Sequence, residues 1–168
     1  ARPLPVILIA RLLGVPEERA DDLLNWSNAM VGMYQARRTR ESEAAAVAAT
    51  EAFVDFLGRY VEERRRRPGN DLITELIAAE EAGDRLSRDE LIATCILLLN
   101  AGHEATVHTI GNGVKTLLET GTGAYWLTPD RIEGTVEEIF RFDPPLHLFT
   151  RWVYEDLEIG GQAFRRGD

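Results

Sequence analysis

The residues best suited to chemistry lie in the middle of a long, mostly apolar stretch. Residues 91–99 are almost all apolar, and Gly102, His103, Glu104 and Thr106 follow closely. A carboxyl group in apolar surroundings holds its proton more readily than one in water, which suits it to proton transfer. Polar residues within a buried helix oppose local stability, and such conflicts tend to mark functional sites. Glu104 is therefore a candidate proton carrier; the alternative is a carboxylate that only bonds to neighbouring polar groups.

Two histidines near this carboxylate are candidate metal ligands, but their spacing does not favour a shared metal ion. His103 and His108 are five residues apart, whereas metal-binding pairs on one helix face are usually four apart. The single cysteine, Cys95, excludes an internal disulfide and a multi-cysteine zinc site. We therefore expect no metal ligand in this chain.

Small or apolar residues recur every four positions in the same stretch. Leu97, Ala101 and Ala105 share one helix face, because residues four apart lie one turn above each other. Small Ala101 and Gly102 leave room for a flat group beside the helix, and they equally permit close helix packing. The residues alone leave both interpretations open.

Three further charged residues stand out near the C-terminus. Glu138 and Arg141 are neighbours at i and i+3 on an expected helix, where a solvent-exposed pair contributes little to stability. Arg151 falls in an expected strand, and arginine binds carboxylates through its planar guanidinium group. The alternative for Arg151 is an ordinary outward-facing strand residue.

The elements that position these residues are predicted to be helices over residues 1–120. Pro5 begins a helix that Gly14 ends, and Pro16 begins a second helix. Ser42 is the expected N-cap of a third helix.

Two more helices complete this part of the chain. Asn70 is the expected N-cap of a short helix. Ser87 and Glu90 match a capping box, and no strong breaker follows until about Thr120. Because residues 91–99 have little polar surface, we expect that half of the long helix to be buried on all sides.

Residues 121–168 are predicted to be one helix followed by β structure. The helix starts at Thr128-Pro129 and ends at Asp143-Pro144-Pro145. The strands and their turn are expected at Phe149–Tyr154, Leu157–Ile159 and Gly160-Gly161. The predicted fold class is mainly α, with a long central helix and a small C-terminal β hairpin.

The amino-acid composition argues against several classes of function. The 168 residues fit one domain, and 45% hydrophobic with 28% charged residues is typical of a globular protein. A net charge of −9 argues against a nucleic-acid partner. No apolar run approaches the ~20 residues that span a bilayer, and the first residues have no secretory pattern. We expect a cytoplasmic protein with no membrane partner.

The order of these motifs resembles the bacterial cytochrome P450 enzymes, the haem-thiolate monooxygenases. The segment from Ala101 to Thr106 precedes the helix of Glu138 and Arg141, and Arg151 follows a Pro-Pro stop. The resemblance covers almost the whole chain, but only the central portion of that fold. It implies one partial domain, with a helical part at residues 1–120 and the Glu-x-x-Arg helix and hairpin at residues 121–168.

The resemblance implies that the long helix crosses the oxygen-binding face of a haem. Leu97, Ala101 and Gly102 would then line the cofactor, and Arg151 would contact a haem propionate. The stretch that contains His147 and Leu148 would form a wall of the substrate pocket, although a surface or core histidine is the more common case.

The resemblance also implies a proton-delivery site. The family uses an acid–alcohol pair, for which Glu104 would be the acid, but Ala105 stands where the alcohol is usual. Thr106 is rotated ~100° around the helix and does not simply replace it. Proton delivery would then use water, a hydroxyl of the substrate, or Thr106 after a local distortion.

The remaining expectations concern the cofactor and the intact reaction. The family buries the pair Glu138 and Arg141 beneath the thiolate side of the haem, which implies a structural role. The implied cofactor is haem b. The implied reaction inserts one oxygen atom from dioxygen into a small organic substrate, with NAD(P)H-derived electrons from a ferredoxin-type or other redox partner.

No window of the chain matches the loop that carries the haem-ligating cysteine. Cys95 lies in the apolar run and is not expected to be the haem ligand. We therefore expect this chain alone to be inactive, and to self-associate through exposed apolar surface. Two alternatives stay open: a cysteine-free relative that acts as a partner or activator of another enzyme, and an unrelated all-α binding protein.

Overall fold

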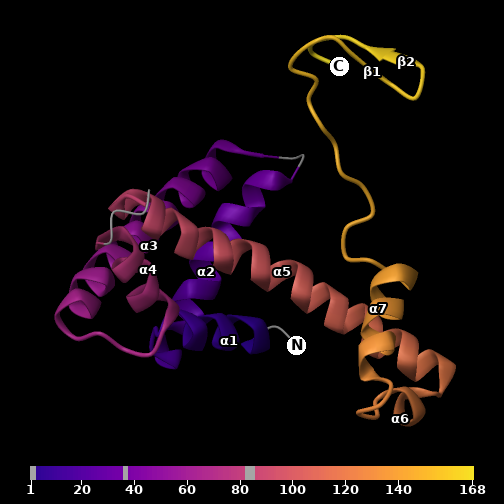
Figure 1. Ribbon diagram of the computed structural model, residues 1–168, viewed down its shortest axis with the longest axis horizontal. Coiled ribbons are helices and arrows are strands. Elements are labelled where there is room, and N and C mark those ends of the chain that lie inside the picture. The colour runs from indigo at the N-terminus through magenta and orange to yellow at the C-terminus, as the bar shows by residue number, and fades with distance from the viewer. Residues whose placement is uncertain (1–2, 36–37, 82–85) are drawn as a thin grey trace.

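The computed structural model describes residues 3–35, 38–81 and 86–168 and is mainly helical (Figure 1). Its elements, in chain order, are α1 (Pro3–Leu13), η1 (Glu17–Arg19), α2 (Ala20–Val31), η2 (Gly32–Tyr34), α3 (Arg40–Arg66), α4 (Leu72–Glu81), α5 (Arg88–Thr120), α6 (Gly123–Trp126), α7 (Ile132–Phe142), β1 (Leu157–Ile159) and β2 (Gln162–Phe164). The η elements are short 3-10 helices. The predicted fold class, mainly α with a small hairpin, is confirmed.

Helices α1 to α4 pack around the N-terminal half of α5 and enclose a hydrophobic core. α2 lies along α3, while α1 and α4 contact α5. The core is built from aliphatic side chains around one aromatic ring, and its largest fully buried members are Phe53, Leu13, Leu23, Leu57, Ile73, Leu91 and Leu99. This body holds the first half of α5 in place.

The N-terminus of α3 differs from the prediction, because Thr39 rather than Ser42 is the N-cap. The Ser42 hydroxyl accepts a hydrogen bond from the Thr39 backbone N–H at 2.8 Å, and the Ser42 N–H donates to Thr39 Oγ1 at 3.1 Å. Both residues are cap formers, and this reciprocal pair places Ser42 inside the first turn.

The N-terminus of α4 is also capped by a different residue than expected, Asp71 instead of Asn70. The Asp71 carboxylate accepts from the Thr74 backbone N–H at 2.9 Å. Its second oxygen lies 3.0 Å from Arg64 Nε at the end of α3. Asp71 takes the cap because its charge also pairs with α3, which the neutral Asn70 side chain would not do.

Helix α5 starts at the predicted capping box. The Glu90 carboxylate accepts from the Ser87 backbone N–H and from the Ser87 hydroxyl, both at 2.7 Å, and these two hydrogen bonds hold the pKa of the Glu90 carboxyl below its ordinary value. The Glu90 backbone N–H donates in turn to Ser87 Oγ at 3.3 Å. The helix is unbroken to Thr120, where Gly121 ends it with a φ of +67°.

Burial of α5 on all sides is not found. Leu91, Cys95 and Leu99 are fully buried against the body, whereas Leu97 is 65% exposed. The described helices pack against one side of this stretch only, so its opposite side faces solvent.

The C-terminal half of α5 leaves the body and contacts α6 and α7 (Figure 1). Helix α6 is not predicted by the sequence. Helix α7 begins at Ile132 rather than at Thr128-Pro129, because the Thr128 carbonyl first closes a turn by accepting from the Arg131 N–H at 3.0 Å. A Cβ on Gly113 would lie 2.7 Å from Ile139 Cδ1, so this glycine permits the close approach of α7.

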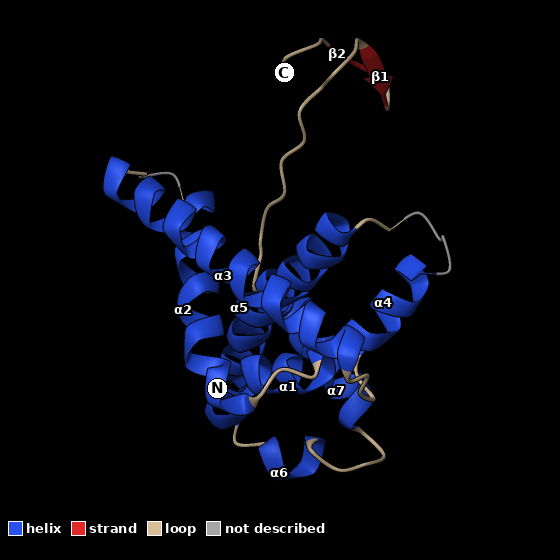
Figure 2. Cartoon of the chain, turned by 90° about the vertical axis from the view of Figure 1, so that its left-hand side faces the viewer, coloured by secondary structure: helices blue, strands red, loops and turns tan. Residues whose placement is uncertain are grey.

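Beyond α7 the chain runs away from the helices as an extended coil and ends in the hairpin (Figures 1 and 2). The strand predicted at Phe149–Tyr154 is wrong: in the described part of the chain, only β1 and β2 pair, and they are antiparallel. Gly160 and Gly161 have φ values of +59° and +80° and form the two-residue turn, as predicted. None of the described helices has the length and apolar character needed to cross a bilayer.

Candidate functional site

One side of α5 is open to solvent at its middle. Leu97 is largely exposed, and Ala101, one turn further on, is exposed as well. Because both residues lie on one helix face, they form a strip with a bulky apolar end and a small end. We call Leu97 and Ala101 the open strip.

Glu104 borders a pocket of about 330 Å³ between α5 and the end of α2 with η2. Asn28 and Gln35 line it from the α2 side, and His103 and His108 from α5. We call this space the α2–α5 pocket. Glu104 Oε1 lies 3.9 Å from His108 Nε2, and both side chains are about half-exposed. The apolar enclosure expected for the carboxylate is therefore not found.

His103 is the buried member of this group. Its side chain lines the pocket, and its Nδ1 atom has no hydrogen-bond partner among the described residues. Burial lowers the pKa of the His103 imidazole; the opposing charge of Glu104 raises it less, and His108 lowers it slightly further. His103 is therefore neutral near pH 7. In the described ranges no three His, Cys, Asp or Glu side chains are grouped to hold a metal ion.

Gly102 faces α1 rather than the open strip. A Cβ at this position would lie 2.9 Å from Ile9 Cδ1, so the missing side chain permits close packing of α1 on α5. The helix continues through Gly102 without distortion. A contact between Gly102 and a cofactor stays a prediction.

Ala105 and Thr106 border a different space, an apolar groove of about 360 Å³ between α5 and α7. The Ala105 carbonyl accepts from the Thr109 hydroxyl at 2.9 Å, which supports a regular helix at this point. Because Glu104 lines the α2–α5 pocket instead, the structure does not bring the Thr106 hydroxyl and the Glu104 carboxylate into one site.

Glu138 and Arg141 form the predicted pair at the surface. Arg141 donates from Nε and Nη2 to the two Glu138 oxygens, at 2.7 and 2.6 Å. Through these hydrogen bonds Arg141 holds the pKa of Glu138 below its usual value, and Glu138 raises the pKa of Arg141. Both side chains are exposed, so the burial that the resemblance implies is not found here.

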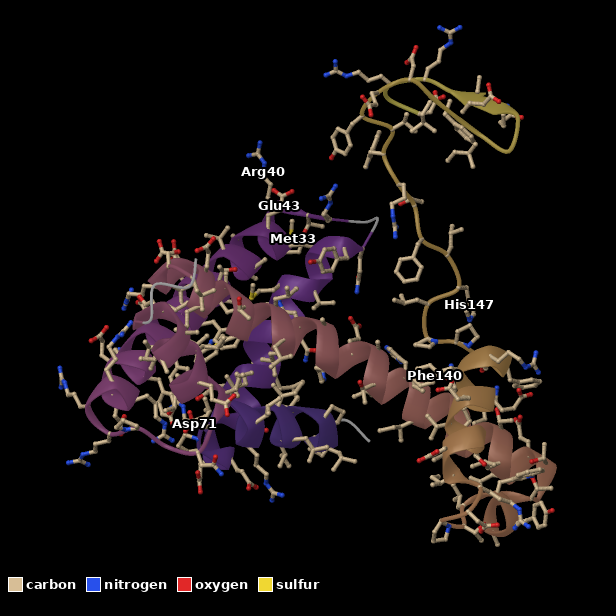
Figure 3. All side chains as sticks on the ribbon, viewed as in Figure 1. Met33, Arg40, Glu43, Asp71, Phe140 and His147 are labelled. Atoms are coloured by element: carbon tan, nitrogen blue, oxygen red, sulfur yellow. The ribbon has the colours of Figure 1, made fainter. Side chains whose placement is uncertain are left out.

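Arg151, His147 and Leu148 lie on the exposed coil after α7. Arg151 donates to the Thr150 carbonyl at 2.8 Å. The strand expected at this residue is not formed. His147 Nε2 lies 3.7 Å from Asp143 Oδ1 at the end of α7 (Figure 3). The coil runs away from α5, so the structure does not gather these residues at the open strip.

Cys95 lies on the opposite, core-facing side of α5. It is fully buried, and burial raises the pKa of its thiol to about 12. The thiol is therefore protonated at neutral pH, and it faces the body rather than the open strip. These properties do not fit a metal-binding thiolate.

Sequence reasoning missed the polar residues that approach α5 from elsewhere. Asn28 and Gln35 reach the α2–α5 pocket across a long sequence separation, which no local pattern reveals. Asn112 donates from its side chain to the Asp143 carbonyl at 3.0 Å and so ties α5 to α7. One signal was available: Glu104 and His108 are four residues apart, so they share a helix face.

The chain is similar over its whole length to curated bacterial cytochrome P450 proteins. It is 36% identical over 171 residues to the polyketide biosynthesis cytochrome P450 PksS of Bacillus subtilis, covering 100% of this chain and 41% of that protein. It is 40% identical over 171 residues to cytochrome P450 107B1 of Saccharopolyspora erythraea, covering 100% of this chain and 40% of that protein. No protein-family model matches the chain.

Solved structures agree with these relatives. The structure of CalO2 superimposes with a TM-score of 0.91 at 30% identity, covering 100% of this chain and 43% of that one. The structure of P450BioI, in complex with an acyl carrier protein that carries hexadec-9Z-enoic acid, gives a TM-score of 0.89 at 32% identity, covering 99% and 44%. In sequence and in fold, the chain is therefore similar to one part of the bacterial cytochrome P450s, and it spans 40–41% of the length of the two curated relatives named above.

Proposed function

We propose that this chain is the oxygen-binding helical part of a haem-dependent monooxygenase. The reaction inserts one atom of dioxygen into a small organic substrate, with electrons that derive from NAD(P)H and arrive through a ferredoxin-type or other redox protein. The similarity to cytochrome P450 proteins along the entire chain supports this class. The observation that carries the proposal is the open strip on α5, since Leu97 and Ala101 leave a long helix uncovered at its middle.

The open strip fits one face of a flat cofactor. Leu97 would pack on the ring, and Ala101 would leave room beside it for dioxygen, because a methyl group is the smallest side chain after hydrogen. When bound, haem b supplies the oxidising chemistry, and the protein contributes orientation and protons. The exposed guanidinium of Arg151 fits a propionate contact, since arginine binds carboxylates well. Cys95 does not fit as the iron ligand, because its thiol is buried and protonated.

Glu104 would hold the proton that the reaction consumes. Its carboxylate lines the α2–α5 pocket, and water in that pocket would supply protons to it. The methyl group of Ala105 has no proton to give, and the Thr106 hydroxyl borders the groove toward α7. A proton from Glu104 would therefore travel through water or through a hydroxyl group on the substrate.

The substrate class we propose is a small, largely apolar organic molecule. One relative is a polyketide biosynthesis enzyme, and another is a steroid C26-monooxygenase of Mycobacterium tuberculosis, 33% identical over 170 residues and with 46% of its length covered. The exposed coil that carries His147 and Leu148 would provide one wall of the pocket, and the exposed pair of Glu138 and Arg141 would be structural.

The test is the absorption spectrum of the complete reading frame that contains this chain. After expression with haem, reduction and exposure to carbon monoxide, the proposal predicts the thiolate-type absorption band. The 168-residue chain alone, treated identically, is expected to lack this band and to be inactive. A complete protein without the band would overturn the proposal, and a band from the chain alone would overturn the assignment of Cys95 as a core residue.

A further inference from the structure

Two neighbouring hollows lie on the outer surface of α3 near its C-terminal end. The larger, of about 730 Å³, lies between α3 and the first residue of α5, and the smaller, of about 370 Å³, lies between α3 and η1. Arg59 and Glu63 line both hollows, so the two adjoin along α3. We call the five arginines of this surface the arginine face: Arg19, Arg59, Arg66, Arg67 and Arg88.

The charge of this surface is opposite in sign to that of the whole chain. Its five arginines face three carboxylates, those of Asp55, Glu62 and Glu63, whereas the chain has a net charge of −9. The Glu62 carboxylate is also partly neutralised, because its Oε1 atom lies 3.6 Å from Arg88 Nε and 3.9 Å from Arg65 Nε. The arginine face is therefore a region of excess positive charge on an acidic protein.

The run of four arginines at the end of α3 divides into two inner and two outer side chains. Arg64 and Arg65 pair with carboxylates of the following turn and of α4, and their side chains are only 22% and 23% exposed. Arg66 and Arg67 are exposed, and their side chains make no hydrogen bond or ion pair with another described residue. The inner pair thus fastens α3 to α4, and the outer pair is open to a partner.

Helix electrostatics explain only part of the arginine face. Cations in the last turn of a helix offset the negative end of its dipole, which accounts for Arg66 and Arg67. Arg88 is the first residue of α5, where the positive end of the dipole disfavours a cation. Its side chain reaches back to α3 and donates from Nη2 to the Gly58 carbonyl at 3.5 Å. Arg59 lies before the last turn of α3, is exposed and has no described partner. Arg59 and Arg88 need another explanation.

We propose that the arginine face binds a carboxylate-rich segment of a partner protein. The planar guanidinium group of arginine binds carboxylates through two parallel hydrogen bonds. The smaller hollow adds the stacked rings of Phe56 and Tyr60, 5.9 Å apart, with the Arg19 guanidinium 5.0 Å from the Phe56 ring centre. Arginine and aromatic side chains are enriched at protein–protein interfaces, so this surface fits a protein better than a small anion.

Charge also directs the partner to this surface. The rest of the acidic chain repels a carboxylate-rich segment, and the arginine face attracts it, which favours encounter in one orientation. Asp55 and Glu63 would meet cations of the same partner and fix its register. The proposal concerns attachment alone: it assigns no electron transfer to this surface, and it does not rest on the proposed function.

The test uses the chain without cofactor and a fluorescent peptide in which glutamates flank a tyrosine. Anisotropy titrations compare the wild type, the double variant Arg59→Gln/Arg88→Gln and the control Arg38→Gln/Arg40→Gln, which removes the same charge at the other end of α3. We expect about three- to tenfold weaker binding in Arg59→Gln/Arg88→Gln, and wild-type affinity in the control. Because salt screens exposed charges, added salt should weaken binding to the wild type.

Two further ligands identify the chemistry that is recognised. We expect no binding of the same peptide with glutamines in place of glutamates, and weaker binding of an oligothymidine of equal charge. Equal affinity of the glutamate peptide for the wild type and Arg59→Gln/Arg88→Gln overturns the proposal, as does its failure to bind the wild type. An oligothymidine that binds as tightly as the glutamate peptide overturns it as well. None of these outcomes depends on haem, so failure here is separate from failure of the proposed function.

Discussion

The two halves of α5 form one continuous helix but are held in different ways. In the N-terminal half, Leu91, Cys95 and Leu99 are fully buried against a body of four other helices. In the C-terminal half, Val114 and Leu118 are exposed, and α6 and α7 lie alongside. The first half is thus fixed by core packing, and the second by a few contacts. The open strip and Glu104 lie where one half passes into the other.

The largest expected effect is a difference in the free energy of unfolding between a variant on the buried side and one on the open side of the N-terminal half of α5. Leu99→Ala should lower the free energy of unfolding by about 2–5 kcal/mol, because it leaves a cavity in the core. Leu97→Ala, two residues away on the exposed side, should change it by no more than about 0.5 kcal/mol. Urea unfolding followed by circular dichroism measures both. Equal losses would show that the two sides are equally buried.

A smaller effect is expected where the second half meets α7. Gly113→Ala should destabilise by about 1–3 kcal/mol, because the new methyl group would press on the Ile139 side chain. The matched variant Gly111→Ala, with nothing within 4 Å of its new Cβ, should stabilise by about 0.5–1 kcal/mol through helix propensity. Thermal unfolding compares them, and the same sign for both would contradict this packing.

The pH dependence of stability probes the junction between the halves. Burial depresses the pKa of His103 in the folded state below its ordinary value of 6.5. At high pH the His103 imidazole is neutral in both the folded and the unfolded state, so its burial carries no protonation cost there. As pH falls from about 6.5 through the folded-state pKa, the unfolded state takes up a proton first, and the free energy of unfolding decreases. The His103→Gln variant should therefore lose less stability than the wild type between about pH 7.5 and pH 5.5. Parallel curves from urea unfolding would contradict this account.

The smallest expected effect concerns the surface of α7. Glu138→Gln removes an exposed ion pair, and exposed pairs contribute little because solvent and salt screen them. The unfolding midpoint should match that of the wild type within error, at low and at high salt. A large, salt-dependent loss would mean that the pair is buried in solution.

Local sequence signals predicted most of the fold. The capping box at Ser87, the end of the long helix near Thr120 and the turn at Gly160-Gly161 were correct because each depends on neighbouring residues alone. Errors arose where two residues competed for one role, as Thr39 did with Ser42 at the start of α3. In such cases the choice depends on geometry that the sequence does not encode locally.

The site was less predictable than the fold. The spacing of Leu97 and Ala101 predicted that they share one helix face, but the sequence did not predict that this face is open to solvent. The packing role of Gly102 depends on Ile9, a residue of a distant helix. The strand predicted at residues 149–154 is not formed. Val153 accepts from the Gly167 N–H at 2.8 Å and donates to the Asp168 carbonyl at 3.2 Å, but these two bonds do not extend into a ladder.

Ligand binding by the complete protein tests most directly the proposal that the open strip borders a haem. Carbon monoxide binding to the reduced protein is followed in the wild type, in Ala101→Trp and in the control Leu118→Trp, an exposed site near the other end of α5. We predict several-fold slower binding and a displaced absorption band in Ala101→Trp alone, because the indole would fill the space beside the haem. Wild-type rates and spectra in Ala101→Trp would contradict the account.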